Sequence, residues 1–298
     1  MKSHGNMINY LSIDVEDYFQ VSAFECISAP SSWAARELRV EQNTDKILAL
    51  LNAQSVKATF FILGWVAERC PELVQRIAAE GHEIASHGYG HQRVTQQTRE
   101  QFREDIRYSK ALLENISGQL VIGYRAPSYS ISRATFWAFD ELCDAGYRYD
   151  SSIFPIRHDF YGMQDWPRFA GLAVRSADGQ WHSGTPDETD KSPRLLEVPI
   201  TTLHFGRRNL PIAGGGYFRF YPYELTRWGL RRINRTEQQP FVFYLHPWEI
   251  DPAQPRMNGA KLKSRARHYL NLDKTESRFE RLLSDFEFTR INQSPALL

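Results

Sequence analysis

Two histidines four residues apart, His87 and His91 in His-Gly-Tyr-Gly-His, are the residues of this chain best suited to metal chemistry. Two imidazoles at this spacing can reach one ion from a single turn or a tight loop. The acidic cluster Asp14-Val15-Glu16-Asp17 offers carboxylate ligands, and two histidines with one carboxylate leave positions open, as catalytic zinc sites require. Nine histidines in 298 residues would often produce such a pair by chance. Whether the pair binds a metal must therefore be judged from the strands and helices around it.

The elements that would position these side chains are predicted from apolar runs and their stops. Residues 9–13 and 82–86 are predicted strands that end just before the acidic cluster and just before His87. An apolar run over 58–63, stopped by Gly64, is typical of a buried parallel strand. Further strands are predicted at 121–125, 147–149, 195–203 and 241–245, and helices at 44–53, from Pro71 to Gly81, and at 99–117, 132–145 and 261–291.

Strands that alternate with helices indicate an α/β architecture with a parallel sheet. The acidic cluster, His87, Arg125 and Asp150 each fall just past the C-terminal end of a predicted strand, which is where α/β barrels build their active sites. Two segments depart from the alternation. Pro155–Pro193 is expected to be a long excursion or a few irregular strands. Gly214–Gly216 is expected to be a loop hinge without the context of a phosphate-binding loop.

Composition narrows the class of protein. A formal net charge of +1 argues against a nucleic-acid-binding protein, which would carry a basic excess. No run of 18 apolar residues occurs and the start, Met1 to Tyr10, lacks an apolar signal core, so a cytoplasmic protein without a transmembrane segment is expected. Three widely spaced cysteines suggest buried thiols in a reducing compartment. The length fits one domain over residues 1–298.

The candidate residues occur in an order that resembles the polysaccharide deacetylase family, the NodB homology domain of carbohydrate esterase family 4. The candidates for its five motifs are, in chain order, Ser12–Asp17, His87 with His91, Arg125–Tyr129, Asp150–Ser152 and Leu245–His246. A finer likeness to deacetylases of exopolysaccharide and PEP-CTERM/exosortase loci rests on Asp14–Phe19, Gly214–Arg219 and Leu245–Glu249. The resemblance implies a distorted (β/α) barrel of the NodB type, with its core at 8–250 and a C-terminal helical extension at 251–298.

The same resemblance implies hydrolysis of an N-acetyl amide and gives each candidate a role. Asp14 would be the general base that takes a proton from water, and Arg125 would keep Asp14 ionised and oriented. His246 would act as the general acid toward the leaving amine. Asp150 would stabilise and orient the His246 imidazolium.

The carboxylate that completes the metal site is the open point. A Zn²⁺ ion on His87 and His91 would polarise the amide carbonyl and acidify a bound water. The family usually has adjacent aspartates, base first and ligand second, whereas Val15 follows the base here. If the strand continues, Glu16 points to the same side as the base and Asp17 to the other, so Glu16 is the first choice of ligand and Asp17 the alternative. If neither reaches the metal, the site is metal-free, as in allantoinase-like relatives.

The expected function is metal-dependent removal of N-acetyl groups from N-acetylhexosamine units of a polysaccharide, an oligosaccharide or a precursor. Tyr129, Tyr217 and Trp248 are the expected aromatic contacts to the sugar. Two alternatives remain open: a metal-independent, allantoinase-like amidohydrolase, and a catalytically silent carbohydrate-binding or assembly protein. Self-association into a homo-oligomer is compatible with the resemblance.

Overall fold

Strand β1 (Ile8–Val15) carries β-branched and aromatic side chains, which suit a buried extended backbone, and every residue after Ile8 is buried. The structure, a computed structural model, describes residues 7–158, 161–185 and 193–297. β1 pairs in parallel with β11 (Val242–Leu245), and near its start also with β12 (Glu287–Thr289). The acidic cluster therefore lies beside His246, because each follows the C-terminal end of one of two paired parallel strands.

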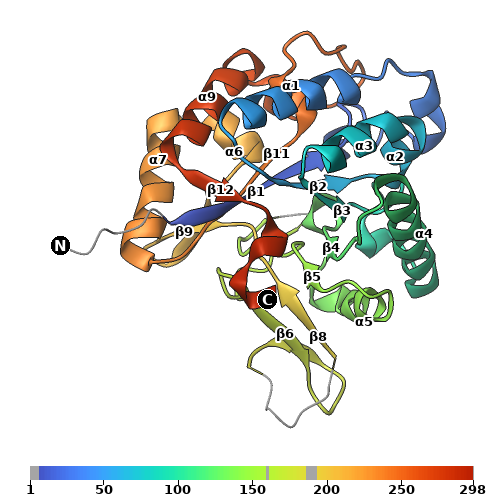
Figure 1. Ribbon diagram of the computed structural model, residues 1–298, viewed down its shortest axis with the longest axis vertical. Helices are drawn as coiled ribbons and strands as arrows, with labels where there is room; N and C mark the ends of the chain where they lie inside the picture. Colours follow the sequence, from blue (N-terminus) through green and yellow to red (C-terminus); the bar gives the residue numbers. More distant parts are fainter. Residues whose placement is uncertain (1–6, 159–160, 186–192, 298) are drawn as a thin grey trace. The chain divides into compact units, whose positions relative to one another are not determined.

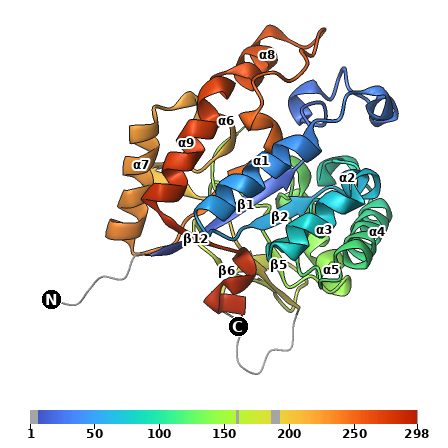
Figure 2. The same ribbon diagram turned by 45° about the horizontal axis from the view of Figure 1, so that its top comes forward.

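The described chain divides into two compact units. The first unit comprises Met1–Thr59 with Ile212–Ile291, and the second comprises Phe60–Pro211 with Asn292–Leu298. The helices of the first unit are α1 (Val40–Ala53), α6 (Gly215–Phe220), α7 (Tyr223–Arg232), α8 (Leu262–Tyr269) and α9 (Leu272–Asp285) (Figures 1 and 2).

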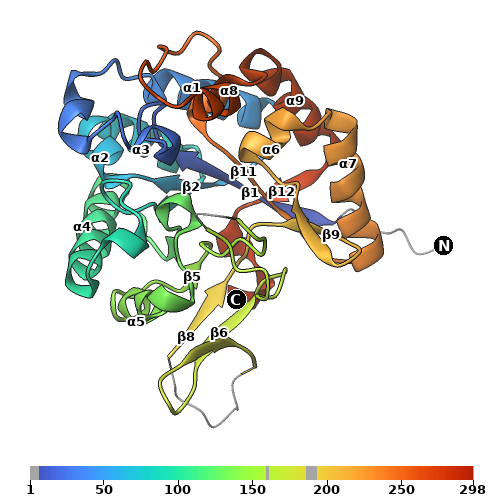
Figure 3. The ribbon, with the colours of Figure 1, turned by 180° about the vertical axis from the view of Figure 1, so that it is seen from behind.

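The first unit covers β1 with helices that are amphipathic. In Figure 2, α1 and α9 run next to each other over β1. Ile47, Leu48 and Leu51 of α1 are buried, at the spacing that places them on one helical face. Figure 3, seen from behind, shows α6 beside α7 in the same unit.

The second unit contains most of the parallel sheet. Its strands lie in the order β2-β3-β4-β5-β8-β6-β7; β4 pairs in parallel with β3, β5 with β4 and β8 with β5, whereas β6 is antiparallel to β8 and β7. The bounds are β2 (Thr59–Ile62), β3 (Glu83–Ser86), β4 (Gly123–Tyr124), β5 (Tyr149–Asp150), β6 (Gly171–Arg175), β7 (Trp181–Ser183) and β8 (Arg194–Glu197). A separate hairpin is formed by β9 (Thr202–Phe205) and β10 (Arg208–Pro211).

Four helices belong to the second unit: α2 (Gly64–Arg69), α3 (Pro71–Ala79), α4 (Arg99–Ser117) and α5 (Trp137–Asp144). α4 packs against the other three and against β3, and Figures 1 and 2 show the four helices gathered together. Thr98 and Gln101 close a capping box at the start of α4, and Gly118 in the left-handed region ends it.

Several expected elements are corrected by the structure. The predicted strand 195–203 is two strands, β8 and β9, and the helical tail 261–291 ends in strand β12, because Glu287–Thr289 pairs with β1. For the segment from Pro155 to Pro193, the expected alternative of a few strands agrees with the β6–β7 hairpin, while residues 159–160 and 186–192 lie outside the described residues.

The glycine run is not the hinge that was expected. Gly215 and Gly216 begin α6, and Gly214 forms an isolated bridge to Tyr244. A Cβ on Gly214 would lie 2.1 Å from the Tyr244 carbonyl oxygen, so the close approach of two backbones requires glycine there.

The expectations of no transmembrane segment and of buried thiols can be compared with the described residues. None of the helices in 7–158, 161–185 and 193–297 is long and apolar enough to span a bilayer. The thiols are not all buried as expected: Cys70 is buried, Cys143 is partly buried and Cys26 is exposed. Burial, with help from Asp140 and Asp144, raises the pKa of Cys143 to about 12.

Candidate active-site residues

Asp14 and Glu16 both face the His246 ring within the first unit. His246 Nε2 lies 3.9 Å from Asp14 Oδ2 and 3.6 Å from Glu16 Oε1. β1 ends at Val15, and the backbone N–H of Glu16 donates back to the Asp14 carbonyl at 3.0 Å. The two carboxylates thus share a side of the chain, as the alternation of strand side chains predicts, and both are nearly fully buried.

Asp17 uses both carboxylate oxygens on backbone amides. Its Oδ1 accepts from Tyr18 N–H at 2.8 Å, and its Oδ2 accepts from Arg39 N–H at 2.7 Å and Val40 N–H at 2.9 Å. The latter two amides open α1, so Asp17 caps that helix from a distance in sequence. Burial raises the pKa of Asp17 to about 6 although these hydrogen bonds oppose the shift.

His246 begins a short 3-10 helix, Pro247–Ile250, and its ring is oriented by Glu249. Nδ1 of His246 hydrogen-bonds Glu249 Oε1, and the His246 backbone N–H donates to the same oxygen at 3.3 Å. Burial disfavours the charged ring, but the carboxylates of Glu16, Glu249 and Asp14 outweigh it and raise the pKa of His246 to about 9. The orienting role expected of Asp150 is thus filled at Nδ1 by Glu249.

Trp248 is 5% exposed and lies inside this group of residues rather than on a surface. Its indole N–H donates to Glu16 Oε1 at 3.2 Å, and its ring stacks against His246 and His268 at centroid distances of 5.3 and 4.2 Å. The expected role as a sugar-stacking platform is corrected, because so buried a ring offers no stacking surface. Trp248 instead orients Glu16.

In the second unit, His87 follows β3 and its tautomer is fixed by a backbone carbonyl. His87 Nδ1 lies 2.8 Å from the Arg125 carbonyl oxygen. Because a carbonyl oxygen only accepts, Nδ1 carries the proton and the ring lone pair is on Nε2. The His91 ring lies 5.5 Å from the His87 ring, centroid to centroid. A histidine held in this way is the usual form of a metal ligand.

The loop between the two histidines is held from both sides by backbone groups and by one carboxylate. The carbonyls of Gly88 and Tyr89 accept from the first amides of α2 at 2.8 and 3.0 Å. Asp105 on α4 accepts from the Tyr89 N–H at 3.1 Å. Burial raises the pKa of Asp105 to about 6, against the hydrogen bonds from Tyr89 and Gly90.

Arg125 is fully buried. Its Nε donates to the Ser151 carbonyl at 3.1 Å and its Nη2 to Ser151 Oγ at 2.8 Å, while its guanidinium lies 4.0 Å from the centre of the Phe61 ring. Asp150 accepts from Ser152 Oγ at 2.6 Å. Burial, joined by the charge of Asp150, raises the pKa of Glu197 well above its usual range, so Glu197 retains the proton between the two carboxyls.

The other two aromatic candidates differ in exposure. Tyr129 has a positive φ of 53° and is 8% exposed, with its ring against Phe154 and Tyr161. Tyr217, in the first turn of α6, is half-buried. Of the three predicted sugar contacts, Tyr217 has the most accessible side chain.

Sequence reasoning missed four residues of this network: Arg219, Glu249, Asp105 and Glu197. Glu249 follows His246 by three residues, a capping-box spacing that could have indicated the contact. Asp105 follows the buried Phe102 by three residues on α4. An acid placed beside the apolar face of a helix could have indicated a buried carboxylate with a partner. Glu197 pairs with Asp150 only through strand register, which the sequence does not reveal.

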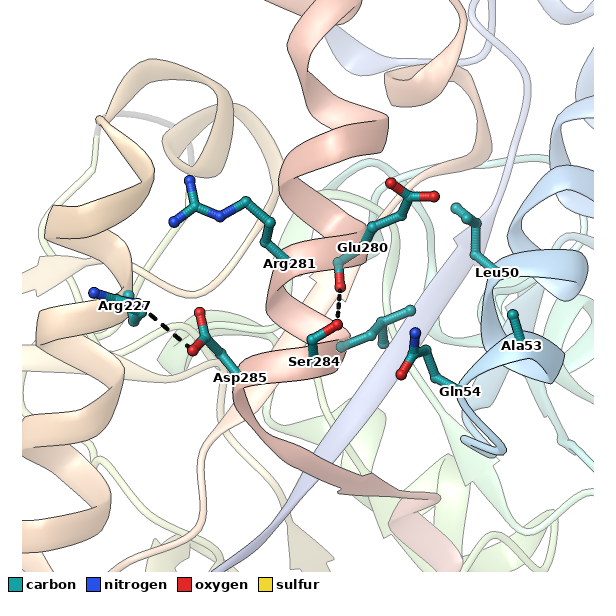
Figure 4. A pocket seen from close by; sticks show the side chains of 9 residues that line it. Leu50, Ala53, Gln54, Arg227, Glu280, Arg281, Ser284 and Asp285 are labelled. Atoms are coloured by element: carbon teal, nitrogen blue, oxygen red, sulfur yellow. Dashed lines mark hydrogen bonds and ion pairs between the residues drawn. The ribbon is translucent and has the colours of Figure 1, made fainter.

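A cavity of about 580 Å³ in the first unit lies between α1, α7 and α9 (Figure 4). Its side chains include Gln54, Glu280 and Arg281, and Asp285 forms an ion pair with Arg227 at 3.6 Å. The cavity contains none of the predicted site residues, so it does not coincide with the candidate active site.

Two family models divide most of the chain between them. A model described as polysaccharide deacetylase matches residues 33–149, which include His87, His91 and Arg125. A model described as a domain of unknown function (DUF3473) matches residues 151–295, which include His246 and Glu249.

Curated relatives match shorter segments. A peptidoglycan-N-acetylglucosamine deacetylase of Bacillus cereus is 41% identical over 75 residues, 25% of this chain and 27% of the relative. A peptidoglycan deacetylase of Helicobacter pylori is 29% identical over 120 residues, 40% of this chain and 39% of the relative. This chain therefore spans between about a quarter and two fifths of the length of these relatives.

Among solved structures, a Mycobacterium smegmatis protein assigned to the polysaccharide deacetylases aligns with a TM-score of 0.58. The alignment covers 98% of this chain and 90% of that protein at 18% sequence identity. At this identity the likeness shows the fold alone, and it confirms the expected α/β fold.

Proposed function

We propose, from the match of residues 33–149 to the polysaccharide deacetylase model, that the protein removes acetyl groups from N-acetylhexosamine units of a polysaccharide or its precursor. The observation that carries the proposal is that His87, His91 and Arg125 all lie within the matched residues. A hydrogen bond between the His87 ring and the Arg125 carbonyl links two of them. The name of the Bacillus cereus relative supports N-acetylglucosamine as the sugar, and that of the Helicobacter pylori relative supports an N-acetylated polysaccharide of the peptidoglycan kind.

The proposed metal ligands are His87, His91 and Glu16, the two imidazoles and the carboxylate that the sequence predicts. The donor set fits zinc, because two imidazoles and one carboxylate are ligands of catalytic zinc sites. The fixed Nδ1 proton of His87 also fits, since it leaves Nε2 as the donor atom. Asp17 is the weaker alternative, because its oxygens already accept backbone amides. When bound, a zinc ion would polarise the acetyl carbonyl and lower the pKa of a water.

The chain's own residues would then move two protons. Asp14 takes a proton from the attacking water as its oxygen forms a bond to the acetyl carbon. His246 donates a proton to the amide nitrogen as the carbon–nitrogen bond breaks, so that acetate and a free amino sugar result. We propose that Arg125 assists Asp14, as the family resemblance implies, and that the charge of Asp150, which accepts from Ser152, supports Arg125. Tyr217 is the proposed aromatic contact to the sugar.

Metal analysis coupled to acetate release tests this function. We expect about one zinc per chain, release of acetate from N-acetylglucosamine oligomers, and loss of release after chelation that added zinc restores. Full activity after removal of the metal would overturn the metal-dependent reading, and turnover of ureides without acetate release would favour the allantoinase-like alternative.

A matched pair of histidine variants locates the site. His87→Ala should lose both zinc and activity, whereas His182→Ala, which removes an exposed histidine of β7 in the same unit, should keep both. A His87→Ala protein that retained zinc and full turnover would remove the site assignment.

A further inference from the structure

We infer that Arg219 and Glu249 are positioning residues that fix the ring of His246, and that this is a function of the chain segment matched by the domain of unknown function. The inference rests on the proposed function for the role of His246 as general acid. It adds two residues and a physical task to a segment whose family description assigns it none.

Glu249 holds His246 at two points. Its Oε1 accepts the Nδ1 proton of the ring and also the backbone N–H of the same residue, the latter at 3.3 Å. Because Nδ1 is held on this side, Nε2 is directed toward Asp14 and Glu16, at 3.9 and 3.6 Å. The stacked Trp248 ring restricts rotation of the imidazole.

Arg219 fixes the other end of the Glu249 carboxylate. Its Nε donates to Glu249 Oε2 at 2.8 Å, and both side chains are almost completely buried. With one oxygen on His246 and the other on Arg219, the carboxylate cannot rotate without breaking a charge-assisted hydrogen bond. Burial would raise the pKa of Glu249, but Arg219 and His246 outweigh burial and lower it, so the acceptor stays ionised.

Arg219 is in turn held by the end of α8. Its Nη1 donates to the carbonyls of Arg267, His268 and Leu270 at 3.0, 2.6 and 3.3 Å, which are orphan acceptors at a helix C-terminus. Asn271 donates to the Arg219 carbonyl at 2.8 Å. The C-terminal extension therefore anchors the guanidinium that aims the Glu249 carboxylate, and through it the His246 ring.

Glu249→Gln tests the inference, because glutamine keeps the size of the side chain and removes the charge that receives Arg219. We expect kcat for acetate release to fall by about 10- to 100-fold, the scale of a misplaced general acid, with KM within about threefold and zinc content unchanged. Arg219→Lys should lower kcat in the same direction, because an ammonium cannot bond the carboxylate and the helix end in the geometry of the guanidinium.

A double variant separates positioning from general stabilisation. If Glu249 acts through His246, His246→Ala combined with Glu249→Gln should have the kcat of His246→Ala alone, to within about twofold. Multiplicative losses in the double variant would overturn the inference, as would a folded Glu249→Gln protein with wild-type kcat.

Asp251 provides the matched control. It is a buried carboxylate two residues from Glu249 that binds Arg39 Nε at 2.6 Å, on the side of α1. Asp251→Asn should weaken folding and leave kcat within about twofold of wild type. A loss of kcat equal to that of Glu249→Gln would show that any broken buried ion pair of this unit has the same effect, and would overturn the inference.

A readout without turnover keeps this inference separate from the proposed function. In metal-free protein, the hydrogen-bonded Nδ1 proton of His246 should give a ¹H NMR signal downfield of the amides. The signal should vanish in His246→Ala and Glu249→Gln and persist in Asp251→Asn. Its persistence in Glu249→Gln at the wild-type position would overturn the positioning role. Absence of acetate release by the wild-type protein, with this pattern intact, would overturn only the proposed function.

Discussion

Glu16 and Asp17 are adjacent acids with different surroundings, and we expect this difference to make Glu16 the metal ligand. Glu16 accepts one indole N–H and faces His246, whereas Asp17 accepts three backbone amides. We expect Glu16→Ala to weaken zinc affinity by at least about 100-fold, more than the loss caused by removing a residue that only orients a ligand. Isothermal titration of metal-free protein with zinc measures this.

The neighbouring variant serves as its comparison. Asp17→Ala removes the cap of α1 and should lower the free energy of unfolding by about 1–2 kcal/mol in urea titrations. Its zinc affinity should stay close to that of the wild type. The reverse result, zinc lost with Asp17 and kept without Glu16, would make Asp17 the ligand.

Asp105 gives the candidate loop a pH dependence that can be isolated by one substitution. The folded-state pKa of Asp105 is raised from 3.8 to about 6, so its contribution to stability is fully present below pH 3.8 and is lost as pH rises through 6. The free energy of unfolding of wild type minus that of Asp105→Asn should therefore fall by about 2 kcal/mol between pH 4 and pH 7. Urea unfolding of metal-free protein measures the difference, and a flat or rising difference would contradict it.

At the scale of elements, the loop between β3 and α4 depends on a glycine that no other residue can replace without moving its anchor. Gly88 has φ +71°, and a Cβ there would lie 2.8 Å from Asp105 Oδ1. Gly118, at the end of α4, has φ +67° but open space around the Cβ position. An alanine would be strained by the positive φ at both positions, but only at Gly88 would its Cβ also meet the Asp105 carboxylate.

Alanine at these two positions separates strain from displacement of the loop. Gly118→Ala should cost about 1 kcal/mol of unfolding free energy and leave zinc affinity unchanged. Gly88→Ala should cost more and weaken zinc affinity by at least about 10-fold, because the carboxylate that holds the loop must shift. Equal zinc affinities in the two variants would show that the Asp105 anchor does not position His87 and His91.

How much of these elements the sequence could predict depends on the range of the interactions. The strand that ends before His87 and the helix 99–117 are local patterns of hydrophobicity and capping, and both are found where expected. The prediction of one strand over 195–203 was wrong. An apolar run does not show that its first part, β8, pairs with β5 while its last part, β9, pairs with β10. β12 was missed because its pairing with β1 joins residues nearly the whole chain apart.

At the scale of the whole molecule, the proposed zinc ligands come from segments far apart in sequence, so metal binding should stabilise the folded chain as a whole. Free zinc at 100 times Kd should add about 2.7 kcal/mol to the free energy of unfolding. Thermal unfolding with and without chelator measures this as a shift in Tm. The shift should be absent in His87→Ala and present in His182→Ala, and a shift of equal size in both would assign zinc to another site.

The candidate site was predictable where a short motif carries the chemistry and not where a partner comes from elsewhere in the chain. The His-Gly-Tyr-Gly-His pair and the residue before Pro247 are visible in the sequence. The Arg219 contact with Glu249 joins α6 to the helix after β11, and the contact of Arg219 with α8 joins α6 to the C-terminal extension. Such contacts depend on folded geometry that no local pattern encodes.

The unequal surroundings of the three thiols give the native chain a built-in position for a covalent probe. Cys70 is buried and Cys143 has a strongly raised pKa, so a thiolate-directed reagent at neutral pH should label the exposed Cys26 first. Cys26 follows Phe24, whose ring lies 4.6 Å from His268 near the end of α8. A fluorophore on this cysteine would therefore report on the α8 end that anchors Arg219, and it requires no engineered residue.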